Sequence, residues 1–278
     1  MKNEKRGLIE MIIATFLWGS TPLMSIYSHL PSGVFVFFRV LFAFPFLLYF
    51  SYKKAKSELF KPPFLPLIFS GIALGVNWIF FFMAFNYADV ASVVTIYYTG
   101  PIISLILAVI FLKEKINIYI ILGIVLAFLG VIISIGGINF QKGILIAILA
   151  GVSYGLLGFL SKIATLYHRP IVVTTWQVFI SIFITLPFLF FQEFEITLKG
   201  LIFAFITGTI HTALALFLWY DALNYIKVSV ASILQYLDIV FSIILAYIFL
   251  NEIPTTNKIA GAFLIVVAGI ISTNKSKK

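Results

Sequence analysis

Four polar residues recur at helical spacing inside the apolar segment 229–250: Ser232, Gln235, Asp238 and Ser242. Separations of three, three and four positions place them on one face of a helix. Polar groups within an apolar span are costly and usually face the interior of a helix bundle. An acidic residue there marks the path of an ion or a substrate by default. The pattern therefore predicts a site centred on Asp238.

A carboxyl group in an apolar span has two favourable states. It is protonated when nothing lies against it, or ionised when a cation does. Asp238 therefore suits a positively charged or zwitterionic ligand, and its proton would be released as the ligand binds. The alternative is structural, because Arg39 or Lys162 could pair with Asp238 only to neutralise a buried charge. We favour the functional interpretation.

The stretch that holds Asp238 occurs twice in the sequence. Asn86–Gly123 and Asn224–Gly261 align without a gap, and Tyr98 then matches Tyr236. In the same alignment Asp238 stands where the first copy has a glycine. A repeat decides the architecture of a chain. In a membrane protein it indicates a transporter whose site lies between the copies.

Further candidates come from polar or aromatic residues near the centres of other apolar segments. Asn77 and His211 fall opposite one another when the third and eighth segments are aligned, and Trp18 pairs with Tyr154 in the first and sixth. The predicted substrate-binding residues are Trp18, Asn77, Tyr97, Tyr154, His211, Gln235 and Asp238. Arg39 is interpreted as a gating or ion-pair residue. The unperturbed pKa of histidine, about 6.5, suits proton exchange.

Each candidate also has a purely structural interpretation. The aromatic rings could pack, and His211 could hydrogen-bond a neighbouring carbonyl group. The amides of Asn77 and Gln235 could tie helices together at about 0.6 kcal/mol for each bond. Glu114 and Glu252 stand at the ends of apolar segments and are interpreted as anchors at the membrane interface.

No motif of an enzyme or a cofactor site is present. The sequence lacks His-Glu-x-x-His, Gly-x-Ser-x-Gly and a phosphate-binding P-loop. Its three histidines are scattered, and it has no cysteine that could bind a metal or form a disulfide. We therefore expect no enzymatic activity, cofactor or catalytic metal, and an ion or substrate gradient as the energy source.

The elements that position these residues are membrane-spanning helices. The sequence is 62% hydrophobic and 10% charged, against about 25% charged residues in soluble domains. A span needs about 20 mostly apolar residues. Ten segments meet this length: 8–27, 33–51, 64–87, 91–112, 117–135, 142–162, 170–191, 199–222, 229–250 and 257–273. The first is predicted to be a retained helix.

The basic residues give these spans an orientation. With both termini in the cytoplasm, 15 Lys and Arg residues lie inside, 3 lie outside and Arg39 lies within a span. Cytoplasmic loops are enriched in Lys and Arg, so this topology is predicted and nucleic-acid binding is not, despite the net charge of +9. Five spans in each copy make the copies inverted, with halves 1–138 and 139–278. The fold class is all-α integral membrane, with two inverted five-helix repeats.

Several short motifs resemble one known family. The first half carries Trp18-Gly19-Ser20-Thr21, Pro31 and Arg39, then Asn86-Tyr87 through Pro101, Leu112-Lys113-Glu114 and Gly123. The second half carries Asn224-Tyr225, Leu250-Asn251-Glu252 and Gly261. In order and duplication these motifs resemble the EamA-like branch of the drug/metabolite transporter superfamily. The resemblance implies a ten-helix carrier of small organic metabolites, often an exporter, in the plasma membrane.

The sequence thus predicts a secondary transporter that works by alternating access at the repeat interface. Amino acids, their derivatives and organic cations fit Asp238 and the aromatic residues, because aromatic faces attract cations. The alternatives are a lipid-carrier flippase, an accessory membrane subunit or, least favoured, an intramembrane enzyme. The expected partners are a small-molecule substrate, the lipid bilayer and protons. The oligomeric state is left open, a homodimer included.

Overall fold

The computed structural model describes residues 2–84, 87, 90–135, 143–191, 193–251 and 253–274, and in these it contains helices and no strand. The join at Gly136–Lys142, Asn86, Glu252 and the C-terminal lysines lie outside the described residues. The helices of the first half are α1 (Lys2–Ser28), α2 (Ser32–Ala55), α3 (Leu65–Ala84), α4 (Val90–Tyr97), α5 (Gly100–Phe111) and α6 (Ile118–Ile135).

The second half begins with α7 (Ile144–Tyr167), α8 (Pro170–Thr185) and the short α9 (Phe188–Phe191). It continues with α10 (Leu198–Ile206), the π-helical segment η1 (Thr207–Leu214), α11 (Ala215–Ala222), α12 (Val228–Leu234), α13 (Leu237–Leu250) and α14 (Thr256–Asn274). Eight helical stretches among the described residues are long and apolar enough to cross a membrane. α5 and α6 are shorter apolar helices.

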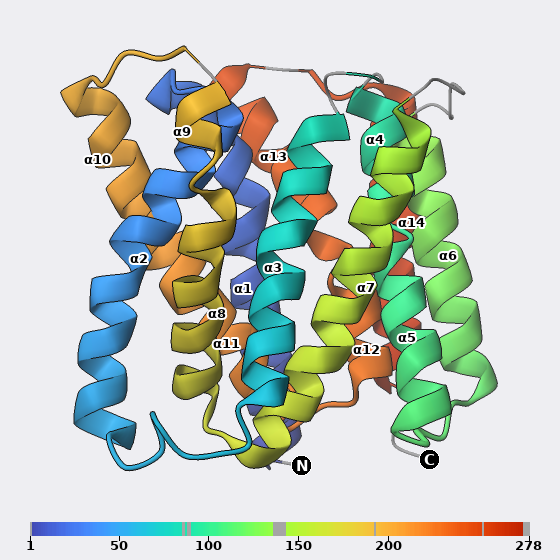
Figure 1. The fold of residues 1–278 in the computed structure, drawn as a ribbon. Helices are drawn as coiled ribbons and strands as arrows, with labels where there is room; N and C mark the ends of the chain where they lie inside the picture. The colour runs from blue at the N-terminus through green and yellow to red at the C-terminus, as the bar shows by residue number, and fades with distance from the viewer. Residues whose placement is uncertain are drawn as a thin grey trace.

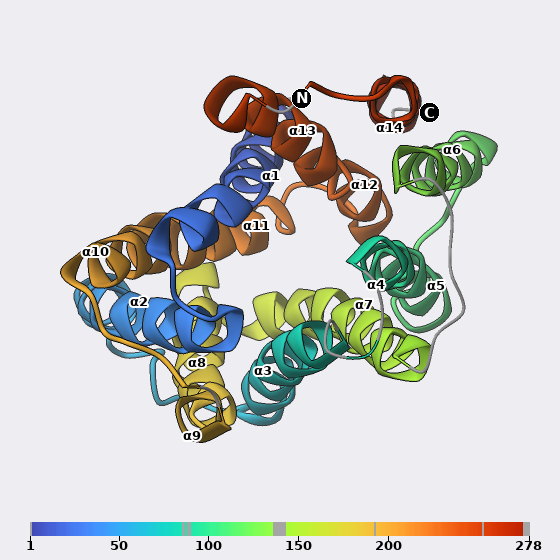
Figure 2. The same cartoon turned by 90° about the horizontal axis from the view of Figure 1, so that it is seen from above.

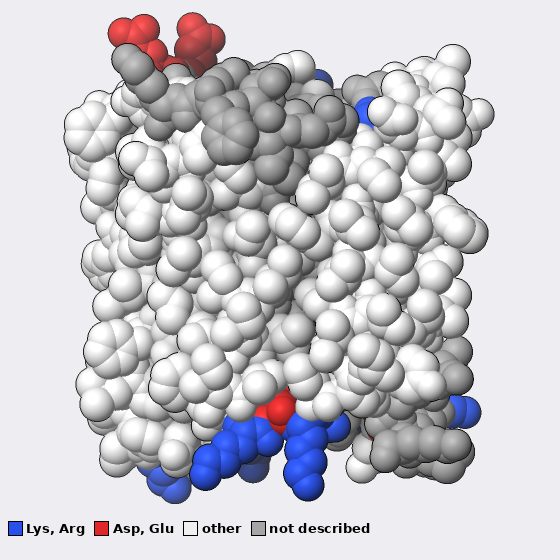
Figure 3. All heavy atoms as spheres, turned by 90° about the vertical axis from the view of Figure 1, so that its right-hand side faces the viewer, with Lys and Arg blue, Asp and Glu red and all other residues white. Residues whose placement is uncertain are grey.

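The helices stand roughly parallel, and both termini lie at the same end (Figure 1). Lys and Arg gather at this end, while the broad middle of the face in Figure 3 carries no charged residue. Seen from above, most helices surround the centre, and α6 and α14 stand side by side at one corner (Figure 2). The uncharged band suits the hydrocarbon layer of a multi-pass membrane protein.

The fourth span of each half is broken, where the sequence predicted continuous helices. α4 ends at Tyr97 and α5 resumes at Gly100, while α12 ends at Leu234 and α13 resumes at Leu237. Pro101 lies in the first turn of α5 and lacks the N–H that would bond the carbonyl of Tyr97, so the helix breaks there. The second copy has no proline here, yet it breaks at nearly the same place.

Both fourth spans also end alike. Lys113 and Asn251, which occupy equivalent positions in the two copies, have positive φ angles of 52° and 55°. At Asn251 this left-handed residue caps the end of α13, a common way to end a helix. The duplicated sequence therefore gives a duplicated backbone, including its irregular parts.

Tyrosine side chains join the two breaks. The Tyr236 hydroxyl donates a hydrogen bond of 2.8 Å to the backbone carbonyl of Tyr98, which stands at the break of the other half. The two rings stack with their centroids 5.7 Å apart. Tyr98 and Tyr236 are equivalent residues of the repeat, so the two halves contact each other here through the same position of each copy.

Small residues allow other helices to approach closely. A Cβ atom on Gly19 would lie 2.6 Å from the carbonyl oxygen of Asp238, and one on Gly155 would lie 2.9 Å from that of Gly100. These positions therefore require glycine, because real Cβ atoms do not approach so closely. Gly19 aligns with Gly155, and Gly100 aligns with Asp238. The two contacts are therefore equivalent, with the roles of the two halves exchanged.

Candidate functional site

A cavity of about 460 Å³ lies between the halves. Its walls come from the second half of α1, the first half of α2, the second half of α3 and the second half of α4. Residues of α7, η1, α11 and the α12–α13 break complete them. All eight candidates from the sequence line it: Trp18, Arg39, Asn77, Tyr97, Tyr154, His211, Gln235 and Asp238. The structure therefore gathers residues from seven of the predicted spans around one space.

Asp238 lies in the first turn of α13, just after the break. The Tyr98 hydroxyl donates a hydrogen bond of 2.9 Å to its Oδ1 atom. Neither cation considered from the sequence forms an ion pair with it in the described structure, because Lys162 instead donates to the carbonyl of Leu223. The carboxyl group therefore faces the cavity with neutral donors, the Tyr98 hydroxyl and the Gln235 side chain among them, and with no ion pair to a protein cation in the described structure.

Arg39 enters the cavity wall from α2 and is 8% exposed. Its guanidinium carbon lies 4.4 Å from the centre of the Trp78 ring. No carboxylate among the described residues lies within ion-pair distance of Arg39, and its buried Nε has no hydrogen-bond partner there. The ion pair considered from the sequence is replaced by an aromatic ring. A buried cation without an anion is costly, so a ligand that brings one would be favoured here.

Tyr97 and Tyr154 form a stacked pair of phenol rings in the cavity wall. The ring centroids lie 4.5 Å apart and the planes are inclined by 8°. The Tyr97 hydroxyl donates to Asn77 Oδ1 over 3.3 Å, and Asn77 Nδ2 donates to the Ala150 carbonyl over 3.1 Å. Asn77 thus links three helices, as its structural interpretation proposed, and it also holds Tyr97 at the cavity.

His211 lies in the π-helical segment η1. Such segments free backbone groups from the helical ladder and are frequent at functional sites. Here the Trp18 indole N–H donates to the His211 carbonyl over 3.1 Å. The His211 Nε2 atom lies 2.8 Å from the Ser20 hydroxyl, and its buried Nδ1 atom has no hydrogen bond of ordinary geometry among the described residues. His211 is therefore held by α1 through both its backbone carbonyl and its ring.

The predicted polar face of the ninth span is only partly at the site. Gln235 and Asp238 line the cavity, whereas Ser232 and Ser242 do not. The helix is interrupted between Leu234 and Leu237, and the prediction of a single face assumed a continuous helix. The Ser242 hydroxyl donates to the Ile239 carbonyl over 2.9 Å. It therefore bonds its own helix.

Sequence reasoning missed several residues of the wall, among them Trp78, Tyr98, Trp219 and Tyr220. Tyr98 had a usable signal, because it recurs as Tyr236 in the second copy. Trp78 follows Asn77 directly but carries no signal of its own. Glu114, interpreted as an interface anchor, instead accepts hydrogen bonds from the first backbone N–H groups of α12.

The cavity offers charges, ring faces and amides, which are groups that bind and orient a polar organic molecule. Among the described residues no group of three or more His, Cys, Asp or Glu side chains is arranged to hold a metal ion.

Comparisons with known proteins match the chain over nearly its whole length. The model of the EamA-like transporter family matches residues 5–136 and again residues 141–274. An "Uncharacterized transporter YxxF" of Bacillus subtilis is 30% identical over 98% of this chain and 90% of its own. An "S-adenosylmethionine uptake transporter" of Rickettsia bellii is 25% identical over 100% of this chain and 97% of its own. A solved crystal structure superposes with a TM-score of 0.85 at 17% identity, over 96% of each chain.

Proposed function

The chain belongs to the EamA-like transporter family, and from that premise we propose that it is a secondary transporter, with no enzymatic activity, of a small zwitterionic metabolite. Ten transmembrane helices form two inverted five-helix repeats, 1–138 and 139–278, in the plasma membrane. The substrate binds in the cavity between the repeats, and rocking of the halves exposes it to each side in turn.

The exchange of equivalent contacts supports the inverted repeat. Gly19 meets Asp238 as Gly155 meets Gly100. Likewise Gly123 lies against the carbonyl of Ala268, and Gly261 lies against that of Gly130. Pairs that exchange partners in this way are what a two-fold axis between the halves requires.

The observation that carries the substrate class is the pair of unmatched charges in one cavity. Asp238 has no protein cation and Arg39 has no protein anion among the described residues. A molecule with an ammonium or sulfonium group and a carboxylate would satisfy both at once. The stacked tyrosines and Trp78 offer faces to its cationic part. S-adenosylmethionine, which the rickettsial relatives are named for, is one molecule of this kind.

Export is the proposed direction, because the cytoplasm is where such metabolites are made. The relatives named as uptake transporters make the opposite direction a real alternative outcome. Flux from preloaded vesicles in both directions would decide between them.

The test is a proteoliposome flux assay with a matched panel: a neutral amino acid, the amine that lacks its carboxylate, the acid that lacks its amine, and S-adenosylmethionine. We expect the wild type to prefer the compounds that carry both charges. The Arg39→Gln protein should no longer transport the amino acid faster than the amine that lacks the carboxylate. The Asp238→Asn protein should no longer transport it faster than the acid that lacks the amine. Arg169→Gln, which removes an exposed pair with Glu58, serves as the control.

Equal fluxes for all four compounds, or unchanged selectivity in both variants, would refute the zwitterion site. Movement of a fluorescent lipid across the bilayer without metabolite flux would instead favour the flippase.

The orientation has its own test, because the chain has no cysteine. A single Cys at the exposed Lys54 should resist an impermeant reagent added outside intact cells, whereas one at the exposed Lys199 should react. The reverse result would invert the proposed topology.

A further inference from the structure

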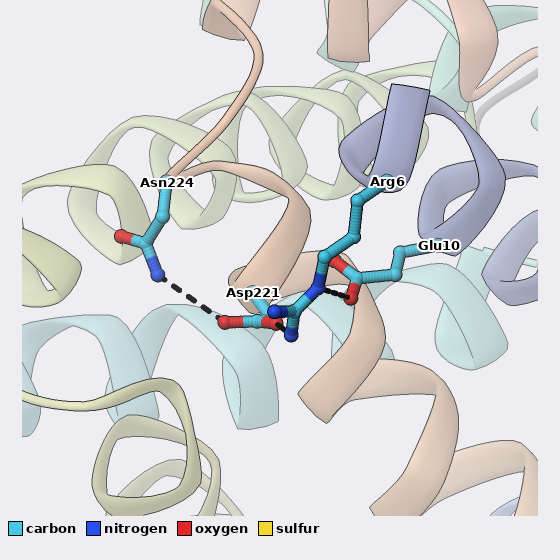
Figure 4. A network of polar contacts seen from close by, with 4 residues as sticks. All are labelled: Arg6, Glu10, Asp221 and Asn224. Atoms are coloured by element: carbon cyan, nitrogen blue, oxygen red, sulfur yellow. Dashed lines mark hydrogen bonds and ion pairs between the residues drawn. The ribbon is translucent and has the colours of Figure 1, made fainter. Parts of the chain in front are cut away.

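A second charged cluster lies at the end of the molecule that carries the termini. Arg6 Nε donates to Glu10 Oε1 over 2.7 Å, and Arg6 Nη2 donates to Asp221 Oδ2. Asn224 Nδ2 lies 3.4 Å from Asp221 Oδ1 on the other side (Figure 4). Arg6 and Glu10 belong to α1, and Asp221 belongs to α11. We call Arg6, Glu10 and Asp221 the α1–α11 cluster.

This cluster joins the two halves on the side away from the cavity. The cavity takes its α1 residues from Trp18 onward, whereas the cluster lies in the first turns of that helix. Fully buried Met11 and Leu223 lie next to the cluster in the sequence and belong to the large apolar core. A Cβ on Gly7 would lie 2.8 Å from Tyr225 Cβ and 3.2 Å from the carbonyl oxygen of Ala222, so α1 touches the end of α11 and the turn that follows it. Passage from the cavity to this end requires that the contact open.

The charges of the cluster do not balance. Two carboxyl groups face one guanidinium, and Glu10 and Asp221 are 8% and 7% exposed. The Glu10 Oε2 atom is buried and has no hydrogen-bond partner in the described structure. An ionised oxygen in that position would be strongly unfavourable.

The neighbouring charged and titratable groups do not correct this imbalance. Arg6 also stacks over Tyr225, with its guanidinium carbon 4.8 Å from the ring centre. Lys162 of α7 donates to the Leu223 carbonyl, and Glu114 accepts from the first turn of α12. Lys227 donates to the Lys115 carbonyl over 3.4 Å. Lys162, Glu114 and Lys227 are therefore engaged elsewhere, and Tyr225 brings no second cation to the cluster.

We propose that the α1–α11 cluster binds one exchangeable proton on Glu10, and that the protonated cluster holds α1 against α11 and closes the cavity at the terminal end. Glu10 is the site because its buried Oε2 atom has no hydrogen-bond donor in the described structure, whereas the Asp221 Oδ2 atom accepts from Arg6. When the halves part at this end, water solvates both carboxylates and the proton leaves. This site is separate from the substrate site, and its test needs no substrate.

The direction of the pH effect follows from linkage. The closed form binds the proton more tightly than the open form, so lowering the pH favours closure and raising it favours opening. One proton allows the ratio of open to closed molecules to change by at most about tenfold per pH unit. A structural ion pair with no exchangeable proton would give no such slope.

The test is a distance measurement between spin labels on single cysteines at Lys5 and Lys227. Both positions are exposed, and they flank the cluster on the two halves. The protein would be held in lipid nanodiscs at pH 5 to 9, in an Asp238→Asn background so that the cavity acid does not contribute. We expect the longer-distance population to grow as the pH rises.

Variants then distinguish a proton-binding site from an ion pair that has only a structural role. Glu10→Gln keeps the shape of the protonated acid, so it should stay closed at every pH and lose the slope. Arg6→Gln should increase the longer-distance population near neutral pH. Arg169→Gln, at an exposed pair on the same end, should behave as the parent does. A parent distribution that does not change with pH, or a Glu10→Gln slope equal to the parent's, would overturn the proposal even if Arg6→Gln fails to fold.

Discussion

Tyr98 and Tyr236 stand at the same point of the two fourth spans, yet their hydroxyl groups have different partners. Tyr236 donates to the backbone carbonyl of Tyr98, a bond that joins the two breaks. Tyr98 donates instead to the carboxyl group of Asp238. The first copy has Gly100 at the position of this acid, because the Tyr154 ring fills the space where a side chain would lie.

The comparison shows how two copies with nearly the same backbone form a binding site whose side chains differ between the copies. Both copies keep the helix break, the left-handed residue that follows the span and the glycine contacts. They differ in the side chains that reach the cavity, where an acid replaces a glycine and a histidine replaces an asparagine. Asymmetric binding groups on a nearly symmetric frame suit a substrate that is itself asymmetric.

The largest effect should come from removing the charge that only the second copy has. Asp238→Asn keeps an oxygen that accepts from Tyr98, so the protein should fold. Losing the interaction with a ligand cation should weaken binding by about 1.5–3 kcal/mol, roughly 10- to 100-fold. Wild-type affinity should fall at low pH as Asp238 is protonated, and the variant should lose this dependence. Substrate titrations at several pH values measure both.

Gln235→Ala and Ser242→Ala serve as milder comparisons on the same span. An Asp238→Asn protein with wild-type affinity and an unchanged pH profile would reduce Asp238 to a structural role.

The next effect should come from adding a side chain where the first copy has none. A Cβ on Gly100 would lie 2.5 Å from Tyr154 Cδ1, and that ring is fixed by its stack with Tyr97. Gly100→Ala should therefore destabilise the protein by about 1–3 kcal/mol. Gly269→Ala is the control, because its nearest neighbour would be 3.5 Å away. Thermal unfolding in detergent compares them, and equal midpoints would contradict the packing described here.

The two tyrosines should respond differently to the same change. Tyr236→Phe leaves the Tyr98 carbonyl at the helix break without its donor, which should cost about 1–2 kcal/mol of stability. Tyr98→Phe removes a donor from Asp238, so its main effect should be on substrate affinity and on the pH dependence of transport. Unfolding midpoints and affinities for both variants test this. Equal losses of stability with unchanged affinities would show that the copies use this residue alike.

The smallest effects should separate Asn77 from His211. Asn77→Ala removes two interhelical hydrogen bonds, to Tyr97 and to the Ala150 carbonyl, each worth about 0.6 kcal/mol on average. His211→Ala should shift the pH profile of transport without abolishing binding, because its Nε2 contacts Ser20 and its buried Nδ1 has no hydrogen bond of ordinary geometry among the described residues. Transport rates measured across pH for the two variants provide the comparison. A pH shift in Asn77→Ala, with none in His211→Ala, would reverse these assignments.

Much of the architecture could be read from the sequence because hydropathy and repetition dominate a membrane protein. Eight of the ten predicted spans correspond to helical stretches long enough to cross a membrane among the described residues, and the fourth and fifth correspond to shorter helices. The register that pairs Trp18 with Tyr154 also describes the glycine contacts. The helix breaks were not predicted. Pro101 gave a signal in the first copy, but nothing local marks the break before Leu237. At this break Tyr236 bonds the Tyr98 carbonyl of the other half, and a single segment does not encode such a contact.

The charged residues could be predicted only in part, because contacts between helices are not visible in the sequence. Asp238 was selected because acids inside spans are rare, but Glu10 and Asp221 also lie inside predicted spans and were passed over. Arg6 was counted only as a topological signal. Its contact with both acids depends on how α1 meets α11, which spacing along either helix cannot show.

The pairing of α6 with α14 has a consequence for how the protein assembles. Each is the last helix of its half, and each carries a glycine that lies against a backbone carbonyl of the other. A half inserted alone would present this narrow groove to lipid, whose chains cannot enter it as closely as a backbone does. The complementary half is the surface that fits. Two separately made halves should therefore associate with one another in the bilayer. The covalent link between them would then mainly ensure that the two halves are present in equal amounts.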